Sequence, residues 1–370
     1  MTPSSSISRA EQLTALAIFM VVVVLFAFYG VYLARSLVPL STEMSALELS
    51  HRGWTDTISA YALLLKAWGA IAGPSLNAAR TFSLLAAVAS LVMVFHIGRR
   101  LSGDPLIAAC LTISFVLYPP LVGTLVCATP HAAAMLLSLM VMEVMLTATQ
   151  RSGGDRFIYG CLAGVLASFA TLLLPLAAIL MPLWLLFCGA FMSATAIALI
   201  ITFATSAVIL LLNISPPHVD VDLSASGHST IFTALILPYA MVPVFVLLGS
   251  LAACSTTVRS EIGVRWLVVG LAAPVVLGGS LWLAVAWGSL MPGQLVTTMG
   301  YGIVFTIFAP WPLIVWARRV MPQVKSLLAW IVFPVVMYSC FWVILGPVDP
   351  GKFPYSHLQV LQPGEAARRL

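Results

Sequence analysis

Residues 13–34 read LTALAIFMVVVVLFAFYGVYLA, a predominantly apolar run that holds no charged side chain. A helix needs roughly 20 such residues to cross the hydrocarbon core of a bilayer. The run is too long for the core of a typical signal peptide, and it ends in bulky residues rather than in a small-residue cleavage site. We therefore predict a retained transmembrane helix at this position.

The remainder of the chain repeats this pattern. Hydrophobic residues make up 61% of the sequence and the mean hydropathy is +1.07, whereas soluble domains contain ~45–50% apolar residues. Short charged or Gly/Pro-containing breaks separate the apolar runs, at intervals that suit helices rather than barrel strands. We predict an all-α polytopic membrane protein with about eleven spans. They lie near 13–34, 81–98, 106–122, 131–148, 157–173, 176–191, 195–212, 231–254, 266–288, 303–317 and 327–345.

The division of residues 157–212 into three spans depends on Pro175, Pro182 and Gly189. Proline and glycine are both tolerated inside transmembrane helices, so a division into two spans is the alternative.

Basic residues set the predicted orientation, because Lys and Arg favour short cytoplasmic connections. With the N-terminus inside, the inner connections hold Arg9, Arg99, Arg100, Arg151, Arg156, Arg259, Arg265, Arg318, Arg319 and Lys325. The outer segments hold the acids Glu43, Glu48, Asp56, Asp220, Asp222, Asp349 and Glu365. This pattern predicts a cytoplasmic leader at 1–12, a transmembrane domain at 13–346 and an outer C-terminal tail at 347–370.

Charge and cysteine usage exclude several classes of protein. The net charge of +5 belongs mostly to inner connections that face an anionic leaflet, so we expect no nucleic-acid partner. The six cysteines form no CxxC pair and fall in or near apolar runs, which is typical of small buried hydrophobes. No histidine pair has ligand spacing and no nucleotide-binding fingerprint is present, so we expect neither a metal nor a cofactor.

The outer loop at 35–80 is predicted to contain two interfacial helices, which together form a shelf above the bundle. Ser41 or Thr42 can cap the first helix, whose first turn carries Glu43. Its apolar stripe is Leu40, Met44 and Leu47. The second helix places Tyr61, Leu64, Leu65 and Trp68 on one side and stops at Gly73-Pro74.

The charged residues of this loop suit acid–base chemistry beside a phosphate. A carboxylate could act as general base, the candidates being Glu43, Glu48 and Asp56. Basic side chains could bind the phosphate of a substrate, the candidates being Arg80, Lys66, His51 and Arg52. His131, at the start of a later span, could face the same cavity. From spacing alone, ordinary solvated surface residues are the more common explanation for such charges.

Glu143 is the only carboxylate inside a predicted span. It lies within about two turns of the inner end of its helix, where His96 could be its partner. An intramembrane acid is a functional candidate because an unpaired charge there is costly. Its position near water equally suits a structural role, and the sequence leaves both open.

Four motifs resemble the N-terminal module of polyprenyl-phosphate-sugar-dependent GT-C glycosyltransferases, the bacterial relatives of protein O-mannosyltransferases and of the lipid A aminoarabinose transferase. The motifs are ALLLKAW at 62–68, GPS at 73–75, ARTFS at 79–83 and GRRLSG at 98–103, followed by Tyr118-Pro119-Pro120 at an outer turn. The resemblance covers residues 10–150. It implies a GT-C-like fold in the bacterial inner membrane, with a polyprenyl-phosphate-linked sugar as the partner of the outer loop.

Three positions depart from the pattern of that family. Its Asp-Glu pair, in which Asp is the usual catalytic base, is matched here by Thr42-Glu43. Its His-Pro-Pro is matched by Thr57-Ile58-Ser59, and its acidic-Ala-Arg motif by residues 128–131, which read ATPH. The outer loop therefore keeps only the second acid of the family's pair.

Two functional hypotheses follow. In the first, the protein is an inverting sugar transferase in which the donor phosphate lies near Arg80 and Lys66, while Glu43, or Glu48 or Asp56, deprotonates the acceptor hydroxyl. In the second, it is a catalytically inactive GT-C-like scaffold that binds partner membrane subunits. A lipid or solute transporter, suggested by the number of spans and by Glu143, is a third possibility.

Overall fold

The computed structural model describes residues 9–36, 39, 41–51, 60–117, 125–173, 193–211, 311–320, 332, 334 and 335. Within these residues the secondary structure is entirely helical, with no β-strand. The helices are α1 (Arg9–Ser36), α2 (Ser41–His51), α3 (Ala60–Ala72), α4 (Leu76–Ser102), α5 (Pro105–Leu117), α7 (His131–Thr149), α8 (Gly154–Leu173), α10 (Ser193–Leu211) and α15 (Trp311–Val320).

Four helices of the described part, α1, α4, α7 and α8, are long and apolar enough to cross a membrane. They coincide with the predicted spans at 13–34, 81–98, 131–148 and 157–173, so the prediction of an all-α chain with membrane-length helices is confirmed at this level. Three further predicted spans overlap shorter stretches of helix: α5, α10 and α15. The predicted spans at 176–191, 231–254 and 266–288, and nearly all of 327–345, lie outside the described residues.

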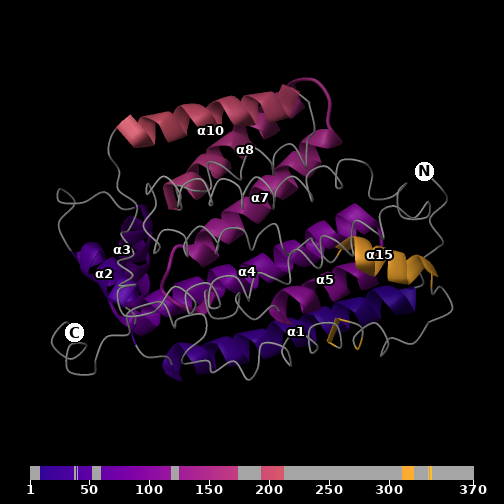
Figure 1. Ribbon diagram of the computed structural model, residues 1–370, viewed down its shortest axis with the longest axis horizontal. Helices are drawn as coiled ribbons and strands as arrows, with labels where there is room; N and C mark the ends of the chain where they lie inside the picture. Colours follow the sequence, from indigo (N-terminus) through magenta and orange to yellow (C-terminus); the bar gives the residue numbers. More distant parts are fainter. Residues whose placement is uncertain are drawn as a thin grey trace, which may run out of the picture.

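The bundle is built around α4 (Figure 1). α4 packs against α1 and α5 on one side and against α7 on the other, and α8 then packs between α7 and α10. The centre of these contacts is fully buried and apolar, with Leu91 and Val94 from α4, Leu111 from α5 and Leu139 from α7. Where the helices emerge from lipid, burial of such side chains takes apolar surface out of water. This stabilises the fold by roughly 25 cal/mol per Å² of that surface.

α8 and α10 run in the same direction, and their contact is made possible by glycine. A Cβ on Gly160 would lie 2.8 Å from the Ala194 carbonyl oxygen, and one on Gly164 would lie 2.8 Å from Cβ of Ile201. The second turn of α8 therefore lies against the first turn of α10, and the two helices continue side by side in the same direction.

The start of α4 differs from the prediction. Gly73 has a positive φ of 89°, which a side chain would strain, and Ser75 then caps the helix by accepting a hydrogen bond from the Ala78 N–H. α4 consequently begins at Leu76 rather than near residue 81, and Arg80 belongs to the helix rather than to the predicted loop at 35–80. The predicted start of the helix was too late because the uninterrupted apolar run begins only after the charged Arg80.

The two predicted shelf helices are both present, as α2 and α3, and lie at one end of the bundle beside the start of α4 (Figure 1). Met44 and Leu47 of α2 are buried, as predicted, and so are Tyr61 and Leu65 of α3. Leu64, predicted on the same side of α3 as Tyr61 and Leu65, is 39% exposed. We call α2 and α3 the shelf, and this end of the bundle the shelf end.

At the opposite end of the bundle, α15 packs against α5, and one of its arginines links it to Glu11 and Asp104. The Arg318 Nε donates to Asp104 Oδ2 over 3.0 Å, and Arg318 Nη2 lies 3.6 Å from Glu11 Oε1. Asp104 also accepts a hydrogen bond from the Leu106 N–H through Oδ1 and so begins α5. A residue late in the chain thereby joins the first helix and the connection between α4 and α5.

Candidate functional site

The shelf and the start of α4 enclose a pocket of about 270 Å³. Its lining includes His51, at the end of α2, and Lys66, in the middle of α3. Its other lining residues are Leu47, Ser50, Leu65, Trp68, Gly69, Ala70, Gly73, Pro74, Ser75 and Ala79. Two of the residues that the sequence predicted to bind substrate are thus brought to one pocket by different helices.

Trp68 forms a fixed wall of this pocket. Its indole Nε1–H donates to the Ala78 carbonyl of α4 over 2.8 Å, and its ring lies 5.8 Å from that of Phe82, tilted by 47°. Because the only donor of the indole is already used, Trp68 offers the pocket an apolar ring face. The lining of the pocket therefore combines an apolar ring with two residues that carry nitrogen donors, Lys66 and His51.

Glu43 and Arg80 form an ion pair beneath the shelf. Arg80 Nε donates to Glu43 Oε1 over 2.9 Å and Nη2 donates to Oε2 over 2.6 Å, which is the two-pronged geometry that a guanidinium forms with a carboxylate. Both side chains are buried, Glu43 with 0% and Arg80 with 2% of its surface exposed. Neither residue lines the pocket.

Two backbone groups complete this ion pair. Arg80 Nη1 donates to the Ala34 carbonyl over 2.7 Å, in the last turn of α1, where helix carbonyls lack intrahelical partners. The Ala128 N–H donates to Glu43 Oε1 over 2.7 Å. The pair therefore ties α2 to α4, to the end of α1 and to the bend that precedes α7.

The sequence predicted Glu43 as a base and Arg80 as a phosphate ligand, and the structure brings the two together as partners of each other. In this arrangement a phosphate at Arg80 would have to displace the Glu43 carboxylate. Breaking a buried ion pair is strongly destabilising because one charge is left without compensation. The geometry observed is that of a structural link between the shelf and the bundle.

Tyr61 and Ser83 lie close to this link. The Tyr61 hydroxyl and the Ser83 hydroxyl share a hydrogen bond of 3.4 Å between α3 and α4. Burial raises the pKa of the Tyr61 phenol above its ordinary value, and the hydrogen bond with Ser83 offsets only part of that rise. Tyr61 therefore stays neutral and serves as a hydrogen-bonding contact of the shelf.

The other predicted residues lie apart from the pocket or outside the described part of the chain. Glu48 is exposed on α2, one turn before His51. His131 is half-buried at the start of α7, where Nδ1 lies 3.0 Å from the Thr129 hydroxyl oxygen, and it does not line the pocket. Arg52 and Asp56 lie outside the described residues.

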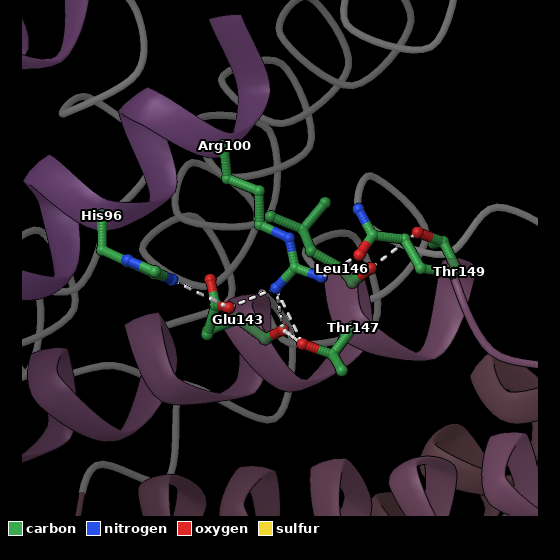
Figure 2. A network of polar contacts seen from close by, with 7 residues as sticks. His96, Arg100, Glu143, Leu146, Thr147 and Thr149 are labelled. Carbon is green, nitrogen blue, oxygen red and sulfur yellow. Dashed lines mark hydrogen bonds and ion pairs between the residues drawn. The ribbon is translucent and has the colours of Figure 1, made fainter. Parts of the chain in front are cut away.

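A second polar cluster lies at the opposite end of α4 and α7 (Figure 2). The predicted contact between His96 and Glu143 is confirmed, with Nε2 of His96 3.3 Å from Oε1 of Glu143. Arg100 also binds Oε1 of Glu143 through Nη1. The same nitrogen donates to the Thr147 hydroxyl over 2.7 Å, and Nη2 donates to the Gln150 side chain over 2.8 Å.

Sequence reasoning missed Arg100 because it assigned residues 98–103 to a connection. The structure continues α4 to Ser102, and Gly103 then ends the helix with a positive φ of 69° and an N–H bond to the Arg99 carbonyl. Arg100 follows His96 by four residues, a spacing that places both side chains on one face of a helix. That spacing was the available signal.

The described residues contain no cluster of three or more His, Cys, Asp or Glu side chains that could hold a metal ion. Of the cysteines in the described part, Cys110 and Cys127 are buried, Cys161 is half-buried, and all three are unbridged. No known family model matches the chain, and no curated protein is similar enough to indicate a relative. The described residues define an all-helical protein with membrane-length helices and, at one end, a largely apolar pocket that Lys66 and His51 also line.

Proposed function

We propose that the protein is a GT-C-like membrane glycosyltransferase that moves a sugar from a polyprenyl-phosphate donor to an acceptor. In this proposal the chain has about eleven spans and lies in the bacterial inner membrane. Its N-terminus is cytoplasmic, its C-terminus is periplasmic and the shelf lies at the outer face. The observation that carries the proposal is the shelf pocket, which Lys66 and His51 line together with Ser75 and Ala79 at the start of α4.

The chemistry of the pocket suits a phosphate. An ammonium group supplies a positive charge, an imidazole supplies a hydrogen bond, and a helix N-terminus adds the positive end of its dipole. Ser75, Ala79 and the shelf residues bring all three to one place. The apolar wall of Trp68 and Leu65 suits the less polar remainder of a lipid-linked sugar.

The proposed reaction is an inverting displacement. A carboxylate of the first outer loop takes the proton of the acceptor hydroxyl, whose oxygen then attacks the anomeric carbon of the donor. The bond between that carbon and the phosphate oxygen breaks, and polyprenyl phosphate leaves with its charge stabilised by Lys66 and His51. Since Glu43 is paired with Arg80, we assign the base to Glu48 or Asp56 and a supporting role to Glu43.

Binding of polyprenyl phosphate to the purified protein in nanodiscs, measured by native mass spectrometry, tests this proposal. Losing a charge-assisted contact costs about 1.5–3 kcal/mol, so Lys66→Met should weaken binding about tenfold or more. Arg35→Gln is the matched control, since Arg35 is exposed at the same end of the bundle and does not line the pocket. Equal affinity of the wild type and Lys66→Met, or an equal loss in both variants, would contradict the proposal.

One observation favours the inactive scaffold as a second candidate. The acid retained from the resembled family's pair, Glu43, is fully buried and bound to Arg80. The buried Glu43–Arg80 pair is sufficient for a protein in which the shelf has only a structural role. Copurification from native membranes separates the candidates, because a stable partner subunit together with no affinity for polyprenyl phosphate would favour the scaffold.

A further inference from the structure

One face of α4 is exposed between α1 and α7. Phe95 marks its border with α1, because the centroid of its ring lies 4.4 Å from that of Phe19. Arg100 marks its border with α7, where it binds Glu143. Four exposed residues lie between these borders, and their spacing of seven, four and three positions places them in one stripe along the helix. They are Leu85, Val92, His96 and Arg99, which we call the open face of α4.

The open face changes from apolar to basic toward the end of α4 that lies opposite the shelf. Its first two residues are aliphatic, whereas His96 and Arg99 lie within the last two turns of the helix. The charge of Arg100 is compensated by Glu143, but Arg99 forms no ion pair within the part of the chain that the structure describes. The open face therefore joins an apolar surface to a positive charge that no described acid compensates.

We propose that the open face of α4 binds an anionic phospholipid, whose phosphate lies beside Arg99 and His96 and whose acyl chain lies along Val92. Charge and depth select this occupant over a protein partner. α4 has 27 residues and is about 40 Å long at 1.5 Å per residue, which exceeds the ~30 Å hydrocarbon core of a bilayer. Its predicted span, 81–98, ends directly before Arg99, so the guanidinium lies at the level of the headgroups, where basic side chains attract anionic lipids. The proposal is independent of the glycosyltransferase assignment, since the shelf pocket lies at the other end of α4.

Distances along α4 limit how far the acyl chain reaches. Val92 precedes Arg99 by seven positions, which is about 10 Å along the helix, and Leu85 precedes it by fourteen, which is about 21 Å. One leaflet supplies half of the ~30 Å hydrocarbon core, so its acyl chains extend about 15 Å from the headgroups. A lipid with its phosphate at Arg99 therefore contacts Val92 and ends before it reaches Leu85.

Photo-crosslinking at two positions of the open face tests the inference. A photoreactive amino acid replaces either Val92 or Leu85, which are 46% and 51% exposed and so have similar access to lipid. The protein is reconstituted in phosphatidylcholine vesicles that contain a small mole fraction of phosphatidylglycerol. One basic side chain near the headgroups is worth about fivefold in binding of an anionic lipid. We expect the adducts at position 92 to be enriched in phosphatidylglycerol by about that factor, and those at position 85 to match its mole fraction.

Two substitutions at Arg99 show whether the enrichment depends on its charge. Arg99→Gln should return the adducts at position 92 to the mole fraction, whereas Arg99→Lys should preserve most of the enrichment. Raising the salt concentration should weaken it in the wild type, because exposed charges are screened. Arg9→Gln is the matched control, since Arg9 is an exposed arginine at the start of α1, at the same end of the bundle, and its loss should leave the enrichment unchanged.

Four results would overturn the inference. They are equal enrichment at positions 85 and 92, enrichment that survives Arg99→Gln, an equal loss in Arg99→Gln and Arg9→Gln, and adducts at position 92 with a second copy of the chain in place of lipid. The third result would show a general attraction of the basic end for anionic lipid rather than a site at Arg99. Each of them leaves the proposed function of the shelf pocket standing.

Discussion

α4 carries an arginine–glutamate contact near each of its ends, and the two contacts differ chiefly in their access to water. At the shelf end, Arg80 and Glu43 are 2% and 0% exposed. At the opposite end, Arg100 and Glu143 are 18% and 20% exposed, and the adjoining His96 is 59% exposed. The same pair of chemical groups therefore stabilises the protein in two different ways.

The difference shows what each contact does for the fold. A single charge buried away from water cannot be solvated. Loss of either Glu43 or Arg80 would therefore leave the other with an uncompensated buried charge. At the opposite end, water or a neighbouring side chain can replace a lost partner, so each contact there contributes less. The shelf-end pair fixes the shelf to the bundle, and the Arg100 cluster joins α4 to the end of α7.

The largest expected effect comes from Glu43→Gln. The substitution leaves the Arg80 guanidinium buried without a counter-charge, so we expect a loss of about 3–5 kcal/mol of unfolding free energy. The measurement is reversible unfolding of the purified protein in mild detergent. Glu48→Gln is the matched control, since Glu48 is exposed on the same helix and an exposed polar contact contributes at most about 1 kcal/mol.

Arg80→Met and the double variant Glu43→Gln/Arg80→Met complete a thermodynamic cycle. Because the double variant removes both charges, its loss should be smaller than the sum of the two single losses by about 2 kcal/mol or more. Additive losses would show that the two residues act independently and would contradict the proposed structural link.

An intermediate effect is expected from Arg100→Gln. Arg100 donates to Glu143, Thr147 and Gln150, so its loss should cost about 1–3 kcal/mol. Salt should narrow the difference between the wild type and Arg100→Gln, because partly exposed charges are screened. Arg99→Gln is the control, as Arg99 is exposed on the adjacent position of α4. If Arg100→Gln lowered the unfolding free energy as much as Glu43→Gln, the contacts at the two ends of α4 would not differ in their contribution to stability.

The smallest effect is expected from His96→Gln. His96 is 59% exposed and its contact with Glu143 is 3.3 Å long, so we expect a change of less than about 1 kcal/mol in the same unfolding assay. A glutamine can still donate a hydrogen bond to Glu143. A loss greater than that of Arg100→Gln would mean that His96, rather than Arg100, is the principal partner of Glu143.

Much of the described fold was predictable, because apolar runs and the Gly and Pro residues that end helices are local features of the sequence. The runs at 13–34, 131–148 and 157–173 gave helices within a few residues, and the Gly73-Pro74 stop ended α3 correctly. Errors arose where charge interrupts a helix. Arg80 and Arg100 both lie on α4, although the apolar run alone would place them in connections.

The partners of the candidate residues were harder to predict. The contact between His96 and Glu143 was predictable because both lie near the same end of adjacent spans. The pairing of Glu43 with Arg80 joins positions that are 37 residues apart, and the Ala128 N–H comes from a third segment. No local pattern encodes such a contact, since it follows from how α2 folds back onto α4. The sequence therefore identifies Glu43 as an acid of the outer loop but does not predict its buried, paired environment.

The measurement that tests the account most directly is an experimental structure of the protein in nanodiscs that contain polyprenyl phosphate. We predict a phosphate in the shelf pocket, within hydrogen-bonding distance of Lys66, while Glu43 and Arg80 remain paired with each other. Polyprenyl phosphate bound at the opposite end of the bundle, or bound to Arg80 with Glu43 released, would contradict this prediction.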